Sequence, residues 1–191
     1  MGRRFLITGT GPRVGKTTIA CALGFAMRAR GLRVGVMKPA DTVDSQDAQA
    51  LALAVGSTLP MDLICPYRHT AMSATVNAPD LAHIAECFGK IATQNDVVIV
   101  ESSDLIDFVD LAATLDLELI LIVGNRTGHT DAATLIHQIC ETRGLKTAGY
   151  ILCDCDPTPT VDDSPQQIKA SYLGRMRHRE PLARTIVERL L

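Results

Sequence analysis

A glycine-rich segment near the start of the chain carries the residues best suited to chemistry. It reads GTGPRVGKTT over residues 9–18 and follows the apolar run 5–7. In such a loop the backbone N–H groups face an anion, a lysine adds positive charge, and a hydroxyl can bind Mg²⁺. Apolar residues then recur at helical spacing, so a helix N-terminus adds its dipole to the same place. The segment therefore predicts a site for the phosphates of ATP or GTP.

The loop departs from the common pattern G-x-x-x-x-G-K-[ST] at one position. Thr10 stands where the first glycine is expected, and Gly9 lies one residue earlier. A glycine-rich turn without a ligand is the alternative, but strand, loop and helix all occur in the right register. The candidate nucleotide-binding residues of this loop are Gly11, Pro12, Arg13, Val14, Gly15, Lys16, Thr17 and Thr18.

Three charged residues follow or neighbour other predicted strands. Lys38 ends a strand, where a second cation could neutralise charge on a γ-phosphate, or where a lysine could simply extend its head into solvent. Glu101 follows four aliphatic residues, so it could hold Mg²⁺ or be a solvated strand end. Asp47 could be a second metal-binding carboxylate, or an acid that complements the dipole of its own helix. In parallel sheets ligands bind at the carboxyl ends of strands, which favours the functional interpretations of Lys38 and Glu101.

Apolar runs alternate with helical patterns along the chain. Continuous rather than alternating apolar runs indicate strands that are buried on both faces, and helices between them indicate a parallel sheet. We therefore expect an α/β three-layer parallel-sheet P-loop fold in a single domain over residues 1–191. Strands are predicted at 4–8, 33–37, 96–100, 118–123 and 148–152, with a short strand or turn at 168–173, and helices at 16–30, 45–55, 79–93, 107–115, 129–143 and 183–190. The proline-rich stretch 156–165 is expected to be a loop.

Composition limits the classes of function. The chain has 19 Lys and Arg against 21 Asp and Glu, a formal charge of −2, which argues against a nucleic-acid or membrane partner. The basic stretch 175–179 is expected to be a solvated turn. No apolar run is long enough to span a membrane and no secretory leader is evident, so a cytoplasmic location is expected. The six cysteines lack C-x-x-C spacing and are expected to be structural thiols.

The order and spacing of these motifs resemble dethiobiotin synthetases. That family has a G-T-x-x-x-V-G-K-T loop, a K-P lysine, a D-A-x-x-L helix start, a P-Y dipeptide and V-E after the next strand. The matching residues here are Gly9-Thr10 with Val14-Gly15-Lys16-Thr17, Lys38-Pro39, Asp47-Ala48 with Leu51, Pro66-Tyr67 and Val100-Glu101. The resemblance covers residues 4 to 157, and weakly the rest.

The resemblance implies an ATP- and Mg²⁺-dependent ring closure in biotin biosynthesis. A diamine takes up CO₂ or bicarbonate as a carbamate, the γ-phosphoryl group activates it, and the second amine closes a cyclic urea. By motif, Lys16 would bind phosphates, Lys38 would stabilise the carbamate, and Thr42 would lie near the reacting amines. Thr17, Asp47 and Glu101 would bind Mg²⁺. Members of this family are homodimers, so the resemblance implies that this chain also forms a homodimer.

Several positions depart from the pattern of the family. The loop has Gly11-Pro12-Arg13 where the family usually has T-D-T-G, Glu101 is followed by Ser102-Ser103-Asp104 instead of glycines, and Cys153 stands where an asparagine reads adenine. Two alternatives follow. The chain could be a P-loop ligase or ATPase that acts on another carboxylate, or a nucleotide-binding regulator without a diamine site. A switch that resembles the partition-type ATPases is less favoured, because those carry a signature lysine before GKT and here only Arg13 is basic.

Overall fold

A six-stranded parallel sheet forms the centre of the molecule. The computed structural model describes residues 2–69, 80–103, 107–154 and 168–191. In these ranges the strands of the main sheet are β1 (Arg3–Gly9), β2 (Val34–Met37), β5 (Val97–Glu101), β6 (Glu118–Gly124), β7 (Thr147–Cys153) and β8 (Tyr172–Met176). Their order across the sheet is β2-β5-β1-β6-β7-β8, and every neighbouring pair is parallel. Most of their residues are buried, as the continuous apolar runs predicted.

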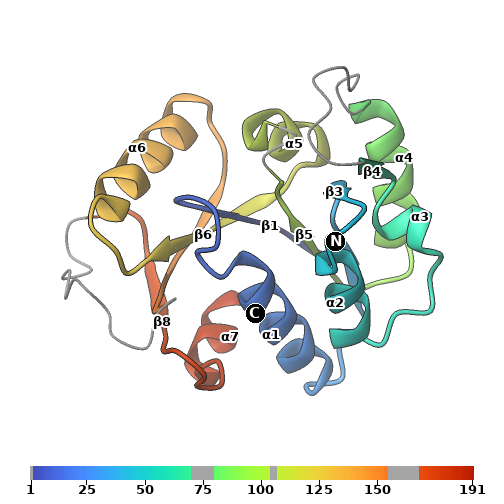
Figure 1. The fold of residues 1–191 in the computed structure, drawn as a ribbon, viewed down its shortest axis with the longest axis horizontal. Coiled ribbons are helices and arrows are strands. Elements are labelled where there is room, and N and C mark those ends of the chain that lie inside the picture. The colour runs from blue at the N-terminus through green and yellow to red at the C-terminus, as the bar shows by residue number, and fades with distance from the viewer. Residues whose placement is uncertain (1, 70–79, 104–106, 155–167) are drawn as a thin grey trace.

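Helices cover both faces of this sheet (Figure 1). One face carries α1 (Lys16–Arg28), α2 (Asp47–Ala54) and α7 (Arg184–Leu190), and the other carries α4 (Leu81–Ala92), α5 (Phe108–Leu115) and α6 (His129–Thr142). Alternation along β1 separates the two cores: Phe5 and Ile7 pack with α1, whereas Leu6 packs with α4 and α5. The predicted three-layer α/β fold is confirmed.

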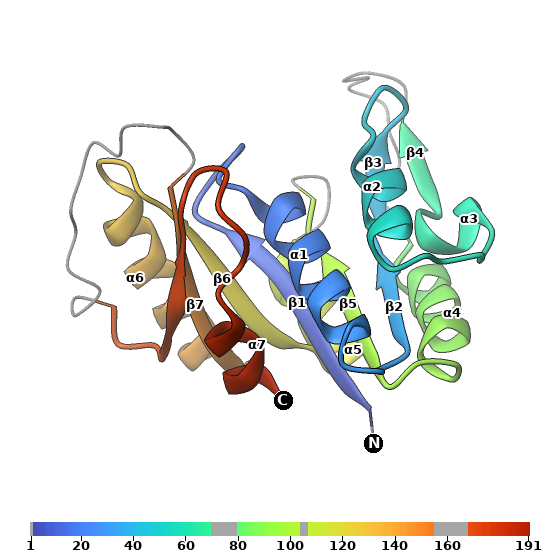
Figure 2. The same ribbon diagram turned by 90° about the horizontal axis from the view of Figure 1, so that it is seen from below.

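A small second sheet stands beside the carboxyl end of β2 (Figure 2). It pairs β3 (Ala40–Thr42) with β4 (Tyr67–His69) in parallel, and the four-residue helix α3 (Met61–Ile64) precedes β4. Three- and four-residue elements are too short to give a periodic pattern, so the sequence did not predict them. Their effect is to hold the segment after Lys38 against the edge of the main sheet.

The C-terminal part of the sheet corrects two predictions. The last strand lies at Tyr172–Met176 rather than at 168–173, and it includes Arg175 and the buried Met176 of the stretch expected to be a turn. Gly174 interrupts the apolar pattern, but a Cβ there would collide with the side chain of Ile186, so packing of α7 on β8 requires glycine. The predicted loop 156–165, together with Asp104 and Cys155, lies outside the described residues. None of the helices in the described ranges has the length and apolar character needed to cross a membrane.

Candidate functional site

The order of the strands brings three predicted site segments together. Because β5 lies between β2 and β1, the residues that follow these strands meet at one edge of the sheet. They surround a cavity of about 570 Å³, a size typical of small-molecule sites. Its lining residues are Pro12, Arg13, Gly15, Lys16, Thr17, Thr18, Lys38, Asp41, Thr42, Asp47, Glu101, Ser102 and Ser103.

The glycine-rich loop connects β1 to α1 with two glycines at restricted positions. A Cβ on Gly9 would lie 2.7 Å from Cγ2 of Val14, so this position tolerates no side chain. Gly15 has φ of 95° and begins α1, whose first turn is not capped by any side chain. This geometry leaves a helix N-terminus directed at the cavity, as an anion-binding loop requires. Gly9, one residue earlier than in the common pattern, therefore allows Val14 to pack closely against the end of β1.

Thr10 fixes the loop to the neighbouring element α6. Its Oγ1 lies 2.6 Å from Nδ1 of His129 and accepts a hydrogen bond of 3.2 Å from the N–H of Gly124. Burial, with a smaller contribution from the charge of Arg126, lowers the pKa of His129. Nδ1 of the neutral ring can then accept a hydrogen bond from the hydroxyl of Thr10, so a threonine at the position of the missing glycine adds an anchor.

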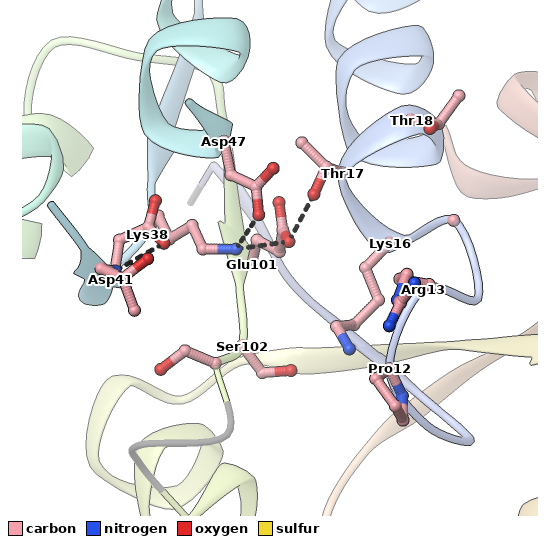
Figure 3. Close-up of a pocket in the computed structure, with 13 residues that line it drawn as sticks. Pro12, Arg13, Lys16, Thr17, Thr18, Lys38, Asp41, Asp47, Glu101 and Ser102 are labelled. Atoms are coloured by element: carbon pink, nitrogen blue, oxygen red, sulfur yellow. Dashed lines mark hydrogen bonds and ion pairs between the residues drawn. The ribbon is translucent and has the colours of Figure 1, made fainter. Parts of the chain in front are cut away.

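The cations of the loop lie at one end of the cavity. Nζ of Lys16 donates to the carbonyl oxygen of Gly11 at 3.1 Å, which holds the ammonium over the curled backbone. Arg13 is exposed and adopts a left-handed φ of 54°. Figure 3 shows both side chains on the opposite side of Thr17 from Lys38. This end is suited to a polyphosphate.

A buried ion cluster occupies the other end. Nζ of Lys38 donates to Oδ2 of Asp47 at 2.8 Å and to Oε1 of Glu101 at 2.7 Å, and the hydroxyl of Thr17 donates to the same Oε1 at 2.8 Å. Lys38 is 5% exposed and Glu101 only 1%. Figure 3 shows the ammonium between the two carboxylates. Asp47 also begins α2, so the metal-type and helix-dipole interpretations of this residue coexist.

Burial and charge act in opposite directions on this cluster. Burial alone would lower the pKa of Lys38, but the charges and hydrogen bonds of Glu101 and Asp47 outweigh it, and the pKa is raised. Burial raises the pKa of Glu101, and the nearby ammonium of Lys38 opposes that rise. Each group thus favours the charged form of the other, which is how a buried pair remains ionised.

The donor set at this place fits a hard divalent cation. Thr17, Asp47 and Glu101 supply hydroxyl and carboxylate oxygens, the ligands that Mg²⁺ prefers. Oε2 of Glu101 is buried and has no hydrogen-bond partner among the described residues. A buried carboxylate oxygen left unpaired is costly, so a ligand at this position would relieve the cost.

Two of the predicted nucleotide-binding residues point away from the cavity. Val14 is fully buried in the core beneath the loop, and Cys153, 2% exposed, supports Gly15 from behind, where its Sγ would lie 2.7 Å from a Cβ at that glycine. Gly11 contributes its carbonyl to Lys16 but does not line the cavity. The other predicted residues, Thr42 included, do line it.

The sequence did not single out three lining residues, Asp41, Ser102 and Ser103, as site residues. Asp41 and Ser102 are both buried. Their place directly after the strand ends that deliver Lys38 and Glu101 puts them in the candidate-site segments, but the sequence alone assigned them no role.

Beyond the cavity, a second polar network closes the same edge of the sheet. Asp154 follows β7 and accepts two-pronged hydrogen bonds from Arg175 of β8, with Nε at 2.9 Å from Oδ2 and Nη2 at 2.8 Å from Oδ1. The side-chain amide of Asn125 donates to Asp154 at 2.8 Å. Arg175 is part of β8, where it pairs with Leu152 of β7, and this network holds its side chain at the edge of the sheet.

Comparisons with known proteins agree with this geometry. The family model described as "AAA domain" matches residues 3–185. An ATP-dependent dethiobiotin synthetase of Anaeromyxobacter dehalogenans is 34% identical, with 95% of this chain and 88% of that protein covered. One of Janthinobacterium sp. is 31% identical, with 86% of this chain and 81% of that protein covered.

Solved structures share the fold at lower identity. The septum site-determining protein MinD of Pyrococcus horikoshii, solved with Mg-ADP, has a TM-score of 0.63 at 17% identity, covering 99% of this chain and 86% of that one. A ParA family ATPase of Chlorobium tepidum has a TM-score of 0.63 at 16% identity, covering 100% of this chain and 89% of that one. These likenesses support the P-loop NTPase fold alone, whereas the sequence relatives define the family. The chain belongs to the dethiobiotin synthetase family.

Proposed function

We propose that this protein is an ATP-dependent dethiobiotin synthetase that carboxylates a diamine and closes it to a cyclic urea. The observation that carries the proposal is the cavity itself. A phosphate-type loop lies at one end and a buried lysine between two carboxylates at the other, in a chain 34% identical to a named dethiobiotin synthetase over most of its length. The cavity is large enough to hold a triphosphate tail beside a small acceptor.

The reaction proceeds in three steps. One amine of 7,8-diaminononanoate takes up CO₂ as a carbamate. A carbamate oxygen then attacks the γ-phosphorus of ATP, the P–O bond to ADP breaks, and a carbamoyl phosphate forms. The second amine attacks the carbonyl carbon, the C–O bond to phosphate breaks, and the urea ring closes with loss of the amine protons to solvent.

The residues of the cavity take distinct roles in this proposal. The N–H groups at the start of α1 and the ammonium of Lys16 bind the phosphates, as a helix N-terminus with a lysine does in other anion sites. Lys38 stabilises the negative charge of the carbamate and of the phosphoryl group in transfer. Thr42 lies beside the amines. Thr17, Asp47 and Glu101 hold Mg²⁺, which when bound neutralises phosphate charge.

The test is a reconstituted reaction with omission controls. With MgATP, bicarbonate and 7,8-diaminononanoate present, we expect dethiobiotin, ADP and phosphate in equal amounts, detected by mass spectrometry and a phosphate assay. Omission of the diamine or of bicarbonate should abolish ADP formation. ATP hydrolysis that continues without the diamine would contradict the proposal and favour an ATPase or a switch. Nucleotide binding without turnover in any mixture would favour a regulatory relative.

We also propose a homodimer, as the family resemblance implies. The expected mass in solution is twice the 20.5 kDa of the chain. Sedimentation velocity with and without MgATP measures it directly, and a single species at the mass of one chain in both conditions would overturn this part of the proposal.

A further inference from the structure

Asp41 is a buried carboxylate in the cavity that none of the roles above uses. It follows Pro39 and Ala40 in β3, where the small sheet holds it against the edge of the main sheet. It lines the same cavity as Lys38, Asp47 and Glu101, and is only 7% exposed. Figure 3 shows it on the side of Lys38 away from the phosphate loop, which is the end left for the acceptor.

One of the two carboxylate oxygens of Asp41 is unsatisfied. Oδ1 accepts a hydrogen bond of 2.9 Å from the backbone N–H of Thr42. Oδ2 is buried and has no hydrogen-bond partner within the parts of the chain that the structure describes. A buried carboxylate oxygen without a donor has lost its hydrogen bonds to water and has gained none in return, which costs free energy. A ligand in the cavity that donates a hydrogen bond to this atom would remove that cost.

Arg68 lies opposite Asp41 in the pairing of β3 with β4, but no described side chain forms an ion pair with Asp41. The ammonium of Lys38 is already shared between Asp47 and Glu101 at 2.8 and 2.7 Å. No ion pair of Asp41 occurs among the described residues. Burial, and after it the charge of Asp41, raises the pKa of the neighbouring thiol of Cys65 to about 11, so that side chain stays neutral. The described residues thus leave Asp41 without a positive partner, which a cationic group of a ligand in the cavity would supply.

We propose that Oδ2 of Asp41 binds an amine of the acceptor substrate and makes the cavity selective for a vicinal diamine over a monoamine. The inference rests on the proposed function, because it assigns the cavity beside Lys38 to the acceptor. An ammonium is the complementary group, since it offers N–H donors to the unpaired Oδ2 and a positive charge to a carboxylate that has no ion pair among the described residues. Asp41 is thus a specificity-determining residue that touches the substrate.

The central experiment compares Asp41→Asn with Asp44→Asn. Asparagine keeps the size of the side chain and an oxygen acceptor for the N–H of Thr42, but it puts an NH₂ donor where Oδ2 was. Asp44 is an exposed acid on the same segment and does not line the cavity, so it is the matched control. Calorimetry measures the affinity for 7,8-diaminononanoate and, separately, for MgATP.

We expect D41N to weaken diamine binding by about 10- to 150-fold, the range of one charge-assisted hydrogen bond, with MgATP affinity unchanged. D44N should alter neither affinity. Diamine binding by D41N as tight as by the wild-type protein would overturn the inference. Retained MgATP affinity also shows that the variant is folded.

A second measurement needs no variant. The wild-type protein should bind 7,8-diaminononanoate at least about tenfold more tightly than at least one of the two monoamines, 7-aminononanoate and 8-aminononanoate. The penalty of D41N should disappear for the monoamine that lacks the contacted group. Equal wild-type affinities for all three compounds would overturn the inference even if D41N failed to fold.

The outcomes separate this inference from the proposed function. Turnover of the diamine with no effect of D41N leaves the function standing and rejects the role of Asp41. Diamine binding that depends on Asp41, without any turnover, supports the inference and rejects the function. Absence of any diamine binding rejects both.

Discussion

At the scale of single residues, Lys38 and Glu101 are the pair on which the site depends most. Lys38 is 5% exposed and Glu101 is 1% exposed, and Nζ of Lys38 lies 2.7 Å from Oε1 of Glu101. Thr17 donates a second hydrogen bond to this carboxylate, and Asp47 accepts one from the ammonium. Each partner cancels the cost of burying the other, so neither can be removed alone without leaving an uncompensated charge. The same contacts hold Lys38 at the end of the cavity opposite Lys16 and Arg13.

Replacing Lys38 with methionine should therefore damage both turnover and stability. We expect dethiobiotin formation to be lost while MgATP affinity stays within a few-fold of wild type. The free energy of unfolding should fall by about 3 kcal/mol, because Glu101 is left buried without its counter-charge. Urea denaturation and calorimetry measure these effects, and Lys90→Met, on the exposed face of α4, is the matched control. Full turnover by K38M would exclude the proposed role of Lys38.

The stability deficit of K38M should depend on pH in a defined direction. Burial raises the pKa of Glu101, and without the ammonium of Lys38 that rise is no longer opposed. The folded variant then binds a proton more readily than the unfolded chain, so lower pH favours the folded state. We expect the deficit relative to wild type to be smaller at about pH 5.5 than at about pH 7.5. A deficit that grows on acidification would contradict this account of the pair.

At the scale of elements, the start of α1 and the end of β7 support one another. Gly15 and Gly128 both begin helices in the left-handed region, with φ of 95° and 82°. Only Gly15 has a neighbour that a side chain would meet, namely Sγ of Cys153, since a Cβ on Gly128 would have nothing within 4 Å. A side chain at Gly128 would therefore introduce backbone strain alone, whereas a side chain at Gly15 would add a steric clash with Cys153.

This difference gives a matched pair of variants. Gly128→Ala should cost about 1–2 kcal/mol of stability, the strain of a left-handed L-residue. Gly15→Ala should cost more and should also weaken MgATP binding, because the loop must move away from Cys153. In the background of Cys153→Ala the excess cost of G15A should shrink. Thermal denaturation and calorimetry measure both quantities, and equal costs for the two glycine variants would show that Cys153 does not support the loop.

The long elements could be predicted from the sequence, and the short ones could not. Runs such as 96–100 and 118–123 identify β5 and β6 to within one residue at each end, because a short uninterrupted apolar run is typical of a strand buried on both faces. The strands β3 and β4 have three residues each, and only the pairing of residues 40–42 with residues 67–69 in the structure reveals them. The last strand was predicted too early in the sequence because Gly174 and Arg175 break the apolar pattern of β8.

The same contrast holds for the site. Lys16, Lys38, Asp47 and Glu101 were each predicted from their place after a strand or at a helix start, and the structure brings them to one cavity. That Lys38 lies between two carboxylates could not be predicted, because it depends on β5 being inserted between β1 and β2. Cys153 was expected at the nucleotide from its place in a motif, and only burial shows that its side chain turns inward. Asp41 was overlooked because its missing partner is visible only in three dimensions.

At the scale of the whole molecule, the cavity joins parts of the chain that are far apart in the sequence. Its walls come from the loop after β1, the end of β2, the small sheet with α2, and the end of β5. Both hydrophobic layers pack against these same strands, one through Ile7 and Ile99 and the other through Leu6 and Val100. A ligand in the cavity would therefore contact segments that both hydrophobic layers hold in place.

Nucleotide binding should consequently stabilise the chain as one cooperative unit. At a free MgATP concentration 100 times the dissociation constant, the free energy of unfolding should rise by about 2.7 kcal/mol if only the folded state binds. Secondary structure and tertiary packing, followed by far- and near-UV circular dichroism, should shift together, because the ligand contacts β1, β2 and β5 at once. Lys16→Ala should remove the shift while leaving the unliganded stability nearly unchanged, since its ammonium makes a single hydrogen bond of 3.1 Å to the loop. If MgATP stabilised the K16A variant as much as the wild type, the triphosphate would not be bound by this loop.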